Sequence, residues 1–309
     1  MDFKHISVLL EESVNSLNIK PDGIYVDCTA GGGGHSAAIL SHLGEKGKMV
    51  LIDQDPDAIE VLTERFKGDS RVNIVHNNFS NIDSILTSLG IDFVDGIVAD
   101  LGVSSHQLDT AERGFSYHYD APLDMRMSQK GKSAADIVNG YSKNELFTII
   151  SRYGEEKFSD RVAAAIVKAR ESGEIKTTLE LAEIVSSAIP AKFRRNGHPA
   201  RKTFQAIRIE VNGELEVLKN TLPVMFEKLN EDGVLAIISF HSLEDKIVKD
   251  YFRTLREGCT CPKDFPVCVC GKKPKAIVKS AGVKASNKEV DENNRSRSAK
   301  LRTAVKIGE

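Results

Sequence analysis

The sequence lacks any apolar run long enough to cross a membrane. No stretch of its 309 residues approaches the roughly 20 consecutive apolar residues that a transmembrane helix needs. The first five residues, MDFKH, also lack the apolar core of a signal peptide. We therefore expect a protein without membrane spans, located in the cytoplasm.

Evenly spaced cysteines and a strong net charge are missing as well. Only five cysteines are present and four form one late cluster, unlike the disulfide framework of a secreted protein. The formal net charge is −2, which argues against a wholly basic nucleic-acid wrapper. Internal repeats and low-complexity segments are not evident, so the chain has the composition of an ordinary globular protein.

Positive charge is nevertheless concentrated in two stretches. Residues 191–208 contain six basic residues and no acidic one, and residues 271–309 contain eleven basic residues against four acidic ones. Two such stretches on a balanced protein suggest a surface that binds polyphosphate. A solvated charged surface explains either stretch alone equally well.

Short apolar runs rich in β-branched residues predict a parallel sheet. Four runs, at residues 24–29, 49–53, 72–75 and 96–100, alternate with predicted helices near the start of the chain. The strongest run comes much later, at 234–239. Intervening helices are predicted at 35–43, after a cap at Asp55 and after a cap at Ser80. This alternation is typical of a doubly wound α/β domain.

A segment with a purely helical pattern interrupts the alternation. It covers residues 133–189 and contains two capping boxes, at Ser142 with Glu145 and at Thr177 with Glu180. We therefore predict an inserted all-helical domain.

The predicted domain limits follow from this interruption. The α/β domain has a first part at 1–106 and a second part at 209–309, and the helical insertion occupies 107–208. The second part resumes with a helix at 214–229 and a helix capped by Ser242. Further short strands are expected near 276–279 and 303–307.

Glycines follow the first predicted strand at the edge where doubly wound sheets bind ligands. That strand ends at Asp27, and residues 31–34 are four glycines at the start of the next helix. Glycine allows a ligand to approach the backbone closely and tolerates positive φ. Asp53 ends the second strand, roughly twenty residues on, where a carboxylate takes the hydroxyls of an adenosine ribose. S-adenosylmethionine and a dinucleotide both fit this pattern.

Asp100 ends the fourth predicted strand and precedes a flexible turn. If the cofactor is S-adenosylmethionine, the methyl acceptor would lie beside Asp100, in line with the sulfonium. The lone pair of an exocyclic amine is delocalised into its ring, so the amine needs an acceptor that orients it and receives its proton. Asp100 is our candidate for this catalytic group, and a ligand of the methionine end of the cofactor is an equally good interpretation.

Longer motifs resemble one known family. DLGVSSHQLD at 100–109, RGFSY at 113–117 and PLDMRM at 122–127 are similar to the ribosomal small-subunit RNA cytosine-N4 methyltransferases, the RsmH or MraW family. The resemblance covers nearly the whole chain. Its further motifs are HISVLLEE at 5–12, GGGGHS at 31–36, HPARKTFQAIRIEVNGEL at 198–215, IISFHSLEDKIVK at 237–249 and RSRSAKLR at 295–302.

The resemblance implies a Rossmann-like S-adenosylmethionine methyltransferase fold with an inserted all-helical domain. It also implies methylation of N4 of one cytosine in the decoding region of 16S ribosomal RNA, with small-subunit RNA or the 30S subunit as the partner. The family's cofactor contacts fall on Gly33, Gly34, His35, Asp53, Phe79, Asp100 and Gln107. From the residues alone, Phe79 fits a cover for adenine or ordinary core, His35 could be a helix residue without a ligand, and Gln107 has no independent interpretation.

The aromatic residue that stacks on the base must come from outside the turn after Asp100. That turn lacks the Asp-Pro-Pro-aromatic sequence of many amino methyltransferases. Phe115 and Tyr117 are our candidates, although packing between domains explains them equally well. RNA contacts are further assigned to Arg194, Arg195, Arg201 and Lys202. The role of His241, which follows the fifth strand at the same edge, stays open.

The late cysteines have the pattern Cys-x-Cys, six residues, Cys-x-Cys. They are Cys259, Cys261, Cys268 and Cys270. Four thiolates this close can hold a structural zinc ion, but Cys-x-x-Cys is the usual spacing. Reduced thiols and disulfides are the alternatives.

Two other functions fit parts of the sequence. A nicotinamide-dependent oxidoreductase would use the glycines and Asp53 but leaves the longer motifs and the basic stretch at 271–309 unexplained. A non-catalytic ribosome assembly factor would retain the pocket without methyl transfer. The sequence does not determine the oligomeric state, and a homodimer is compatible with it.

Overall fold

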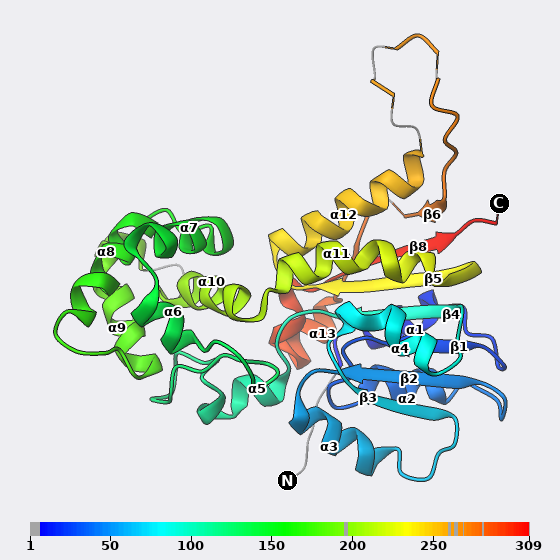
Figure 1. The fold of residues 1–309 in the computed structure, drawn as a ribbon, viewed down its shortest axis with the longest axis horizontal. Coiled ribbons are helices and arrows are strands. Elements are labelled where there is room, and N and C mark those ends of the chain that lie inside the picture. Colours follow the sequence, from blue (N-terminus) through cyan, green and yellow to red (C-terminus); the bar gives the residue numbers. More distant parts are fainter. Residues whose placement is uncertain are drawn as a thin grey trace. The chain divides into compact units, whose positions relative to one another are not determined.

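The computed structural model describes residues 7–194, 197–258, 261–262, 265–267, 269–279 and 281–308. The chain forms two compact units (Figure 1). We call Met1–Gly102 with Leu215–Glu309 the sheet unit, and Val103–Glu214 the helical unit. The predicted insertion at 107–208 lies inside the helical unit.

An eight-stranded sheet forms the centre of the sheet unit, in the order β3-β2-β1-β4-β5-β8-β6, with β7 paired to β8. The strands are β1 (Ile24–Asp27), β2 (Lys48–Asp53), β3 (Val72–His76), β4 (Val94–Asp100), β5 (Leu229–Ser239), β6 (Ala276–Val278), β7 (Val283–Lys284) and β8 (Lys300–Lys306). Strands β1 to β5 pair in parallel, and β8 pairs antiparallel with β5, β6 and β7. All five predicted parallel strands are present. The strand order reverses direction between β1 and β4, which makes their carboxyl ends the switch point of the sheet.

Alternate residues of the buried strands pack against helices on opposite faces. Val26, Ile52 and Ile97 belong to one core cluster, whereas Tyr25 and Leu51 belong to another. The first cluster includes residues of α4 (Ile82–Ser88), α11 (Glu214–Glu227) and α12 (Ser242–Glu257). The second includes residues of α1 (Leu10–Ser16), α2 (Gly34–Leu40) and α3 (Pro56–Arg65). Burial on both faces explains why these strands are almost continuously apolar in the sequence.

The predicted helix caps are partly confirmed in the sheet unit. Asp55 caps α3 by accepting the N–H of Asp57 at 3.1 Å. The cap at Ser80 is wrong, because a 3-10 helix, η1 (Phe79–Asn81), comes first and Asn78 caps it. The cap at Ser242 is also wrong: the preceding histidine occupies the N-cap position of α12.

The helical unit contains α5 (Ser105–Asp109), α6 (Ala134–Gly140), α7 (Lys143–Gly154), α8 (Ser159–Arg170), α9 (Thr178–Ala188), α10 (Arg201–Asn212) and the 3-10 helices η2 (Ala111–Arg113) and η3 (Ala191–Phe193). Helix α7 packs against α8 and α10, and α8 packs against α9. Both predicted capping boxes are confirmed, at the starts of α7 and α9. The unit has its own apolar core, as a separate domain requires.

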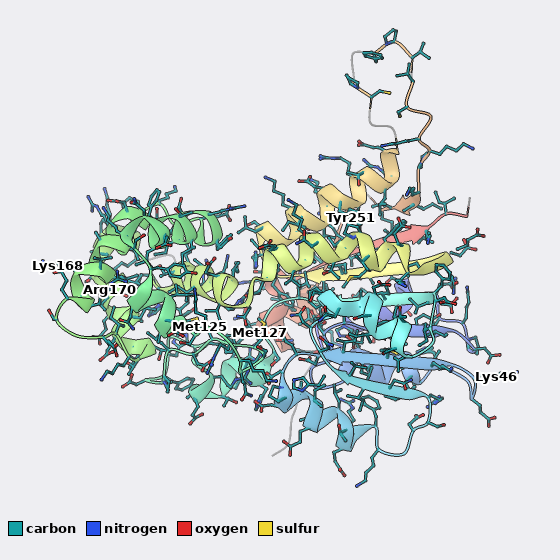
Figure 2. The ribbon with its side chains drawn as sticks, in the orientation of Figure 1. Lys46, Met125, Met127, Lys168, Arg170 and Tyr251 are labelled. Atoms are coloured by element: carbon teal, nitrogen blue, oxygen red, sulfur yellow. The ribbon has the colours of Figure 1, made fainter. Side chains whose placement is uncertain are left out.

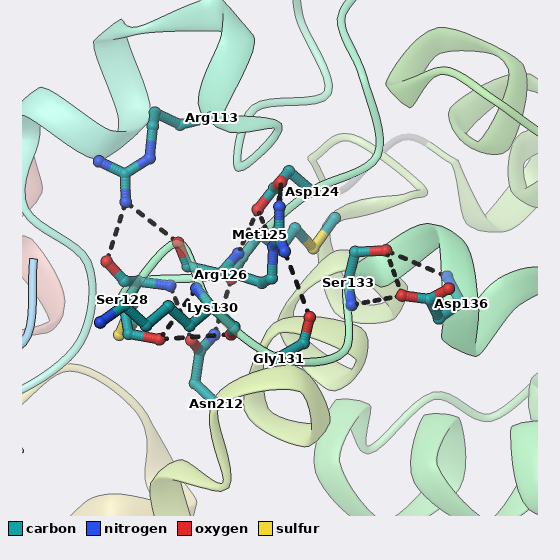
Figure 3. A network of polar contacts seen from close by, with 11 residues as sticks. Arg113, Asp124, Met125, Arg126, Ser128, Lys130, Gly131, Ser133, Asp136 and Asn212 are labelled. Atoms are coloured by element: carbon teal, nitrogen blue, oxygen red, sulfur yellow. Dashed lines mark hydrogen bonds and ion pairs between the residues drawn. The ribbon is translucent and has the colours of Figure 1, made fainter.

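The PLDMRM motif at 122–127 is an irregular segment that is hydrogen-bonded to α10. Asn212 donates from its side chain to the carbonyl of Met125 and accepts the N–H of Met127, each at 2.8 Å (Figure 3). Arg113 donates to the carbonyls of Arg126 and Met127 at 3.1 and 3.0 Å. Both methionines, labelled in Figure 2, are buried in the core of the helical unit. These residues of the motif therefore have a structural role within the unit.

Candidate functional site

Four carboxyl groups lie at or just beyond the carboxyl ends of neighbouring parallel strands in the sheet unit. Asp27, Asp53 and Asp100 end β1, β2 and β4, and Glu244 lies in the first turn of the helix that follows β5. Carboxyl ends of parallel strands meet at one edge of a sheet, so the fold gathers these acidic groups around the switch point.

Asp53 holds the glycine turn in place. One carboxylate oxygen accepts the N–H of Gly31 and the other accepts the N–H of Asp55, each at 2.8 Å. Burial raises the pKa of Asp53 to about 6. The carboxylate thus connects the turn after β1 to the turn after β2, which are the two segments that the sequence predicts beside the ligand.

The glycines of the turn serve different purposes. Gly33 has φ 77°, and a Cβ there would lie 2.8 Å from the ring of Phe66. A Cβ on Gly34 would overlap the hydroxyl of Ser7. At Gly31, with φ 51°, the nearest atom to a Cβ would be 3.8 Å away. The positive φ and the ring of Phe66 therefore favour glycine at 33, and a side chain at 34 would displace the hydroxyl of Ser7. The open backbone at 31 is the position that leaves room for a ligand.

The ring of His35 is used inside the protein. It is buried, and Nε2 lies 3.1 Å from the carbonyl oxygen of Val8. Burial lowers the pKa of His35 to about 4, so the ring is neutral at physiological pH and donates this hydrogen bond. The side chain thereby attaches the N-terminal segment to α2.

Asp27 is a buried site residue to which the sequence assigned no role. It accepts the hydroxyl of Ser36 at 2.6 Å and the N–H of Thr29 at 3.2 Å. Burial raises its pKa to about 6. Its position at the strand end, four residues before Gly31, was the available signal, but its burial depends on the tertiary fold.

Replacement of Asp27 by asparagine is expected to change the pH dependence of stability. Below pH 3.8 the carboxyl is protonated in both the folded and the unfolded chain. As pH rises towards 6, the unfolded chain ionises first, so the wild type loses up to about 3 kcal/mol of unfolding free energy from this group. Asparagine cannot ionise, so the variant should become more stable relative to wild type between pH 4 and 7, as measured by urea unfolding.

Asp69 provides the matched control for this measurement. The neighbouring Arg71 lowers its pKa, so the contribution of Asp69 is lost only as the pH falls below about 4, and the stability difference between Asp69→Asn and wild type should stay nearly constant between pH 5 and 7. A stability difference between Asp27→Asn and wild type that is independent of pH would contradict the raised pKa of Asp27.

Asp100 has a buried oxygen that no group in the described part of the chain satisfies. Its backbone N–H donates to Oγ1 of Thr29 at 2.7 Å, but Oδ1 has no hydrogen-bond partner among the described residues. Burial, and then the charges of Asp27 and Glu244, raise the pKa of Asp100 well above its ordinary range. A buried acceptor without a donor fits a ligand that brings a cation or an amine to this edge.

The segment after β5 is organised by Glu244. This buried carboxylate accepts the N–H of Phe240 at 2.8 Å and that of His241 at 3.3 Å. His241 accepts the N–H of Glu244 on Nδ1, and the two residues form a capping box at the start of α12. The sequence interpretation missed both roles because serine, not histidine, is the usual capping residue.

Phe79 and Gln107 have structural contacts of their own. Phe79 follows β3 and packs at the edge of the apolar core of the sheet unit. In the helical unit, the side chain of Gln107 accepts the N–H of Ser104 at 3.1 Å and completes the capping box of α5. Their assignment to the cofactor stays a prediction.

The two aromatic candidates for base stacking differ in exposure. Phe115 belongs to the core of the helical unit and is 6% exposed, so its ring is covered by protein. Tyr117 is half-buried and stacks on His198, with ring centres 4.4 Å apart and an interplanar angle of 13°. Tyr117 is thus the more accessible of the two candidates, and both assignments stay predictions.

The candidate basic residues of the helical unit are partly engaged. Arg194 donates to the carbonyl of Ile189 at 2.7 Å, and Lys202 donates to that of Glu155 at 2.8 Å. Arg201 is exposed. Arg195 lies outside the described residues.

Part of the basic C-terminal stretch is neutralised within the sheet unit. Lys300 and Arg302 both pair with Asp245, at 2.7 and 2.6 Å. Lys306 donates to the carbonyls of Glu227 and Leu229. The bonds of Lys306 hold β8 to its neighbours without changing its charge. Asp245 offsets part of the charge of Lys300 and Arg302, so the charge count of the sequence overstates what this stretch offers to a polyanion.

Zinc binding by the cysteines stays a prediction. Cys259 and Cys268 lie outside the described residues. Within the described part of the chain, no group of three or more His, Cys, Asp or Glu side chains could hold a metal ion. No helix in that part is long and apolar enough to cross a membrane.

Known proteins are similar to this chain over its whole length. A family model described as the MraW methylase family matches residues 2–307. A ribosomal RNA small subunit methyltransferase H of Clostridium botulinum (strain Kyoto) is 59% identical over 309 residues, covering 99% of this chain and 100% of that protein. A protein of the same name from Lachnospira eligens is 55% identical over 311 residues, covering 99% of each chain.

Proposed function

Because the chain belongs to the MraW methylase family, it is a methyltransferase, and we propose that it transfers the methyl group of S-adenosylmethionine to N4 of one cytosine in the decoding region of 16S ribosomal RNA. The observation that carries this proposal is Oδ1 of Asp100, a buried acceptor without a donor at the switch point of the sheet. The names of the relatives support small-subunit ribosomal RNA as the substrate. Nothing favours an oxidoreductase.

The residues at the sheet edge fit the proposed cofactor. S-adenosylmethionine, when bound, supplies an electrophilic methyl group on a positively charged sulfur. Asp53 would bind the ribose hydroxyls, and the open backbone at Gly31 would lie against the cofactor. Asp27, Asp100 and Glu244 concentrate negative potential where a cation would be stabilised.

Asp100 would also act on the methyl acceptor. An aromatic amine is a weak nucleophile because its lone pair is delocalised, so orientation by a fixed acceptor matters. Oδ1 of Asp100 accepts one N4 hydrogen in this proposal and then receives the proton as the new N–C bond forms. A positive charge nearby lowers the raised pKa of Asp100 and so favours the carboxylate that this step needs.

Nucleoside analysis tests the proposal. Ribosomal RNA from cells with and without the protein is digested and its methylated cytosines are separated by chromatography and mass. Loss of a single N4-methylated cytosine from 16S RNA, restored by the purified protein with S-adenosylmethionine and small subunits, is the expected result. Intact methylation without the protein, together with no transfer in vitro, would instead favour an assembly factor.

RNA contacts are assigned to the helical unit, at Tyr117, Arg194, Arg201 and Lys202. Changing the three basic residues to glutamate is expected to weaken RNA binding and to flatten its salt dependence, by roughly 0.7 to 0.9 in the log–log slope for each phosphate that the protein no longer neutralises. Cofactor affinity should not change. Filter binding at several salt concentrations measures the slope.

Lys168 gives the matched control for this set. It is exposed on α8, outside the basic stretch (Figure 2). Lys168→Glu should leave the slope as in wild type. An unchanged slope in the triple variant, with an unchanged melting temperature, would show that these residues do not face phosphate.

A further inference from the structure

Two buried polar atoms without hydrogen bonds among the described residues lie near the ends of neighbouring strands. Only four side-chain atoms of the described residues are buried and lack a hydrogen bond, and they are Oγ of Ser13, Oδ1 of Asp100, Oγ1 of Thr203 and Nε2 of His241. Asp100 ends β4 opposite Ile238 of β5, and His241 lies three residues beyond Ile238. Native proteins rarely leave buried polar groups unpaired, so two at one edge point to a ligand that supplies both partners.

The two strand-end segments are in direct proximity. A Cβ built on Gly102, two residues after Asp100, would lie 3.7 Å from the ring of Phe240, the residue before His241. Glu244 lies close to both Asp100 and His241 in its electrostatic effect or in distance. Its charge acts on Asp100, and its Oε1 lies 3.2 Å from Nε2 of His241. Glu244 therefore lies beside the ring of His241 and close enough to Asp100 for its charge to act there.

The capping box determines where the proton of His241 lies. Nδ1 accepts the backbone N–H of Glu244, so the neutral ring carries its proton on Nε2. The side chain is only 10% exposed, and Nε2 makes no hydrogen bond with Glu244 despite the short distance. Glu244 instead directs Oε2 to the N–H groups of Phe240 and His241. His241 therefore presents a fixed donor that lies beside Glu244 but makes no hydrogen bond with the described residues.

The edge thus offers an acceptor on one strand end and a donor on the next. Cytosine presents the complementary pair, because its N4 amine donates and the adjacent N3 accepts. Uracil presents the opposite pair, since O4 accepts and N3–H donates. Enzymes that act on an extruded base read this edge of the base by hydrogen bonds.

We propose that His241 is a specificity-determining residue that reads the target base: its Nε2–H donates to N3 of cytosine while Oδ1 of Asp100 accepts from N4. This inference rests on the proposed function, because it assumes that a cytosine is the methyl acceptor. It gives His241 a role in substrate recognition in addition to capping α12.

Two substitutions separate these two roles. His241→Asn keeps a capping acceptor close to the backbone, since asparagine is among the best N-cap residues, but it removes Nε2. His241→Gln places an amide N–H close to the position of Nε2 and weakens the cap. Recognition of the base predicts that the asparagine variant keeps its melting temperature and its S-adenosylmethionine affinity but loses roughly 10- to 100-fold in kcat/KM for small subunits, mainly through KM. The glutamine variant should melt lower yet recover part of that activity. If His241 only caps α12, the asparagine variant should instead be the more active of the two.

Binding of short RNA gives a second readout that does not depend on catalysis. Oligonucleotides carrying cytosine or uracil at the target position are titrated into the protein in the presence of S-adenosylhomocysteine. Wild type should prefer cytosine by roughly 10-fold or more, and His241→Asn should lose this preference. If wild type methylates cytosine N4 while His241→Asn keeps full kcat/KM and the preference for cytosine, the inference about His241 is wrong. If wild type transfers no methyl group to cytosine N4, the proposed function itself fails.

Discussion

Asp100→Asn is expected to slow single-turnover methyl transfer by roughly 10²- to 10⁴-fold at saturating cofactor and RNA, the range typical of general acid–base groups. Asparagine keeps the shape of the side chain and one acceptor oxygen, but it cannot receive the proton from N4. The unpaired Oδ1 supports this role, because a buried acceptor with a purely internal function would have a partner in the protein. Rapid-quench measurement of methylated RNA gives the rate.

Cofactor affinity distinguishes the two roles considered for Asp100. Calorimetry with S-adenosylmethionine should show a smaller loss than the loss in rate. A large loss of affinity, with the rate fully recovered at saturation, would assign Asp100 to the cofactor alone. Wild-type rate and affinity together would exclude both roles.

Asp95 is the matched control on the same strand. It lies near the opposite end of β4 and pairs with Lys20 at 2.9 Å. Asp95→Asn removes a carboxylate from β4 without changing the switch-point edge. It should therefore lower stability modestly and leave the methyl-transfer rate unchanged.

Asp53→Ala is expected to weaken S-adenosylmethionine binding by roughly 10- to 100-fold, the cost of losing a charge-assisted hydrogen bond to the ribose. The same change removes the acceptor for the N–H groups of Gly31 and Asp55, so the melting temperature should also fall. Isothermal titration calorimetry below the melting temperature measures the affinity of the folded protein.

Two further variants separate ribose binding from support of the turn. Asp53→Asn keeps one acceptor oxygen for the turn and should lose less stability than Asp53→Ala while still binding the cofactor weakly. Asp55→Ser removes a neighbouring carboxylate but keeps a capping side chain for α3, so its affinity should equal that of wild type. Unchanged affinity in Asp53→Ala would remove Asp53 from the cofactor site.

Local patterns were sufficient for the framework of the fold. The five parallel strands are buried on both faces, and this burial makes them continuous apolar runs that the sequence displays directly. The helical insertion was visible because its capping boxes and apolar spacing depend on residues three or four positions apart. Asp53 and Asp100 could be placed at the ligand edge because every parallel strand delivers its last residue there.

Features that depend on distant residues could not be predicted. Phe115 and Tyr117 are equivalent in the sequence, but packing within the helical unit buries one and leaves the other half-exposed beside His198. Lys300 and Arg302 count as free positive charge until β8 pairs with β5 and brings them to Asp245.

The sequence by itself determined the strand pattern, the insertion and the family resemblance, because each is encoded in residues close together along the chain. Only the tertiary structure decided the electrostatics of the edge. Burial and the charges of Asp27 and Glu244 raise the pKa of Asp100, and the capping box leaves Nε2 as the donor nitrogen of His241. A pKa shift, or a polar atom left without a hydrogen bond, depends on what surrounds the group in space. Here segments more than a hundred residues apart in the sequence supply those surroundings.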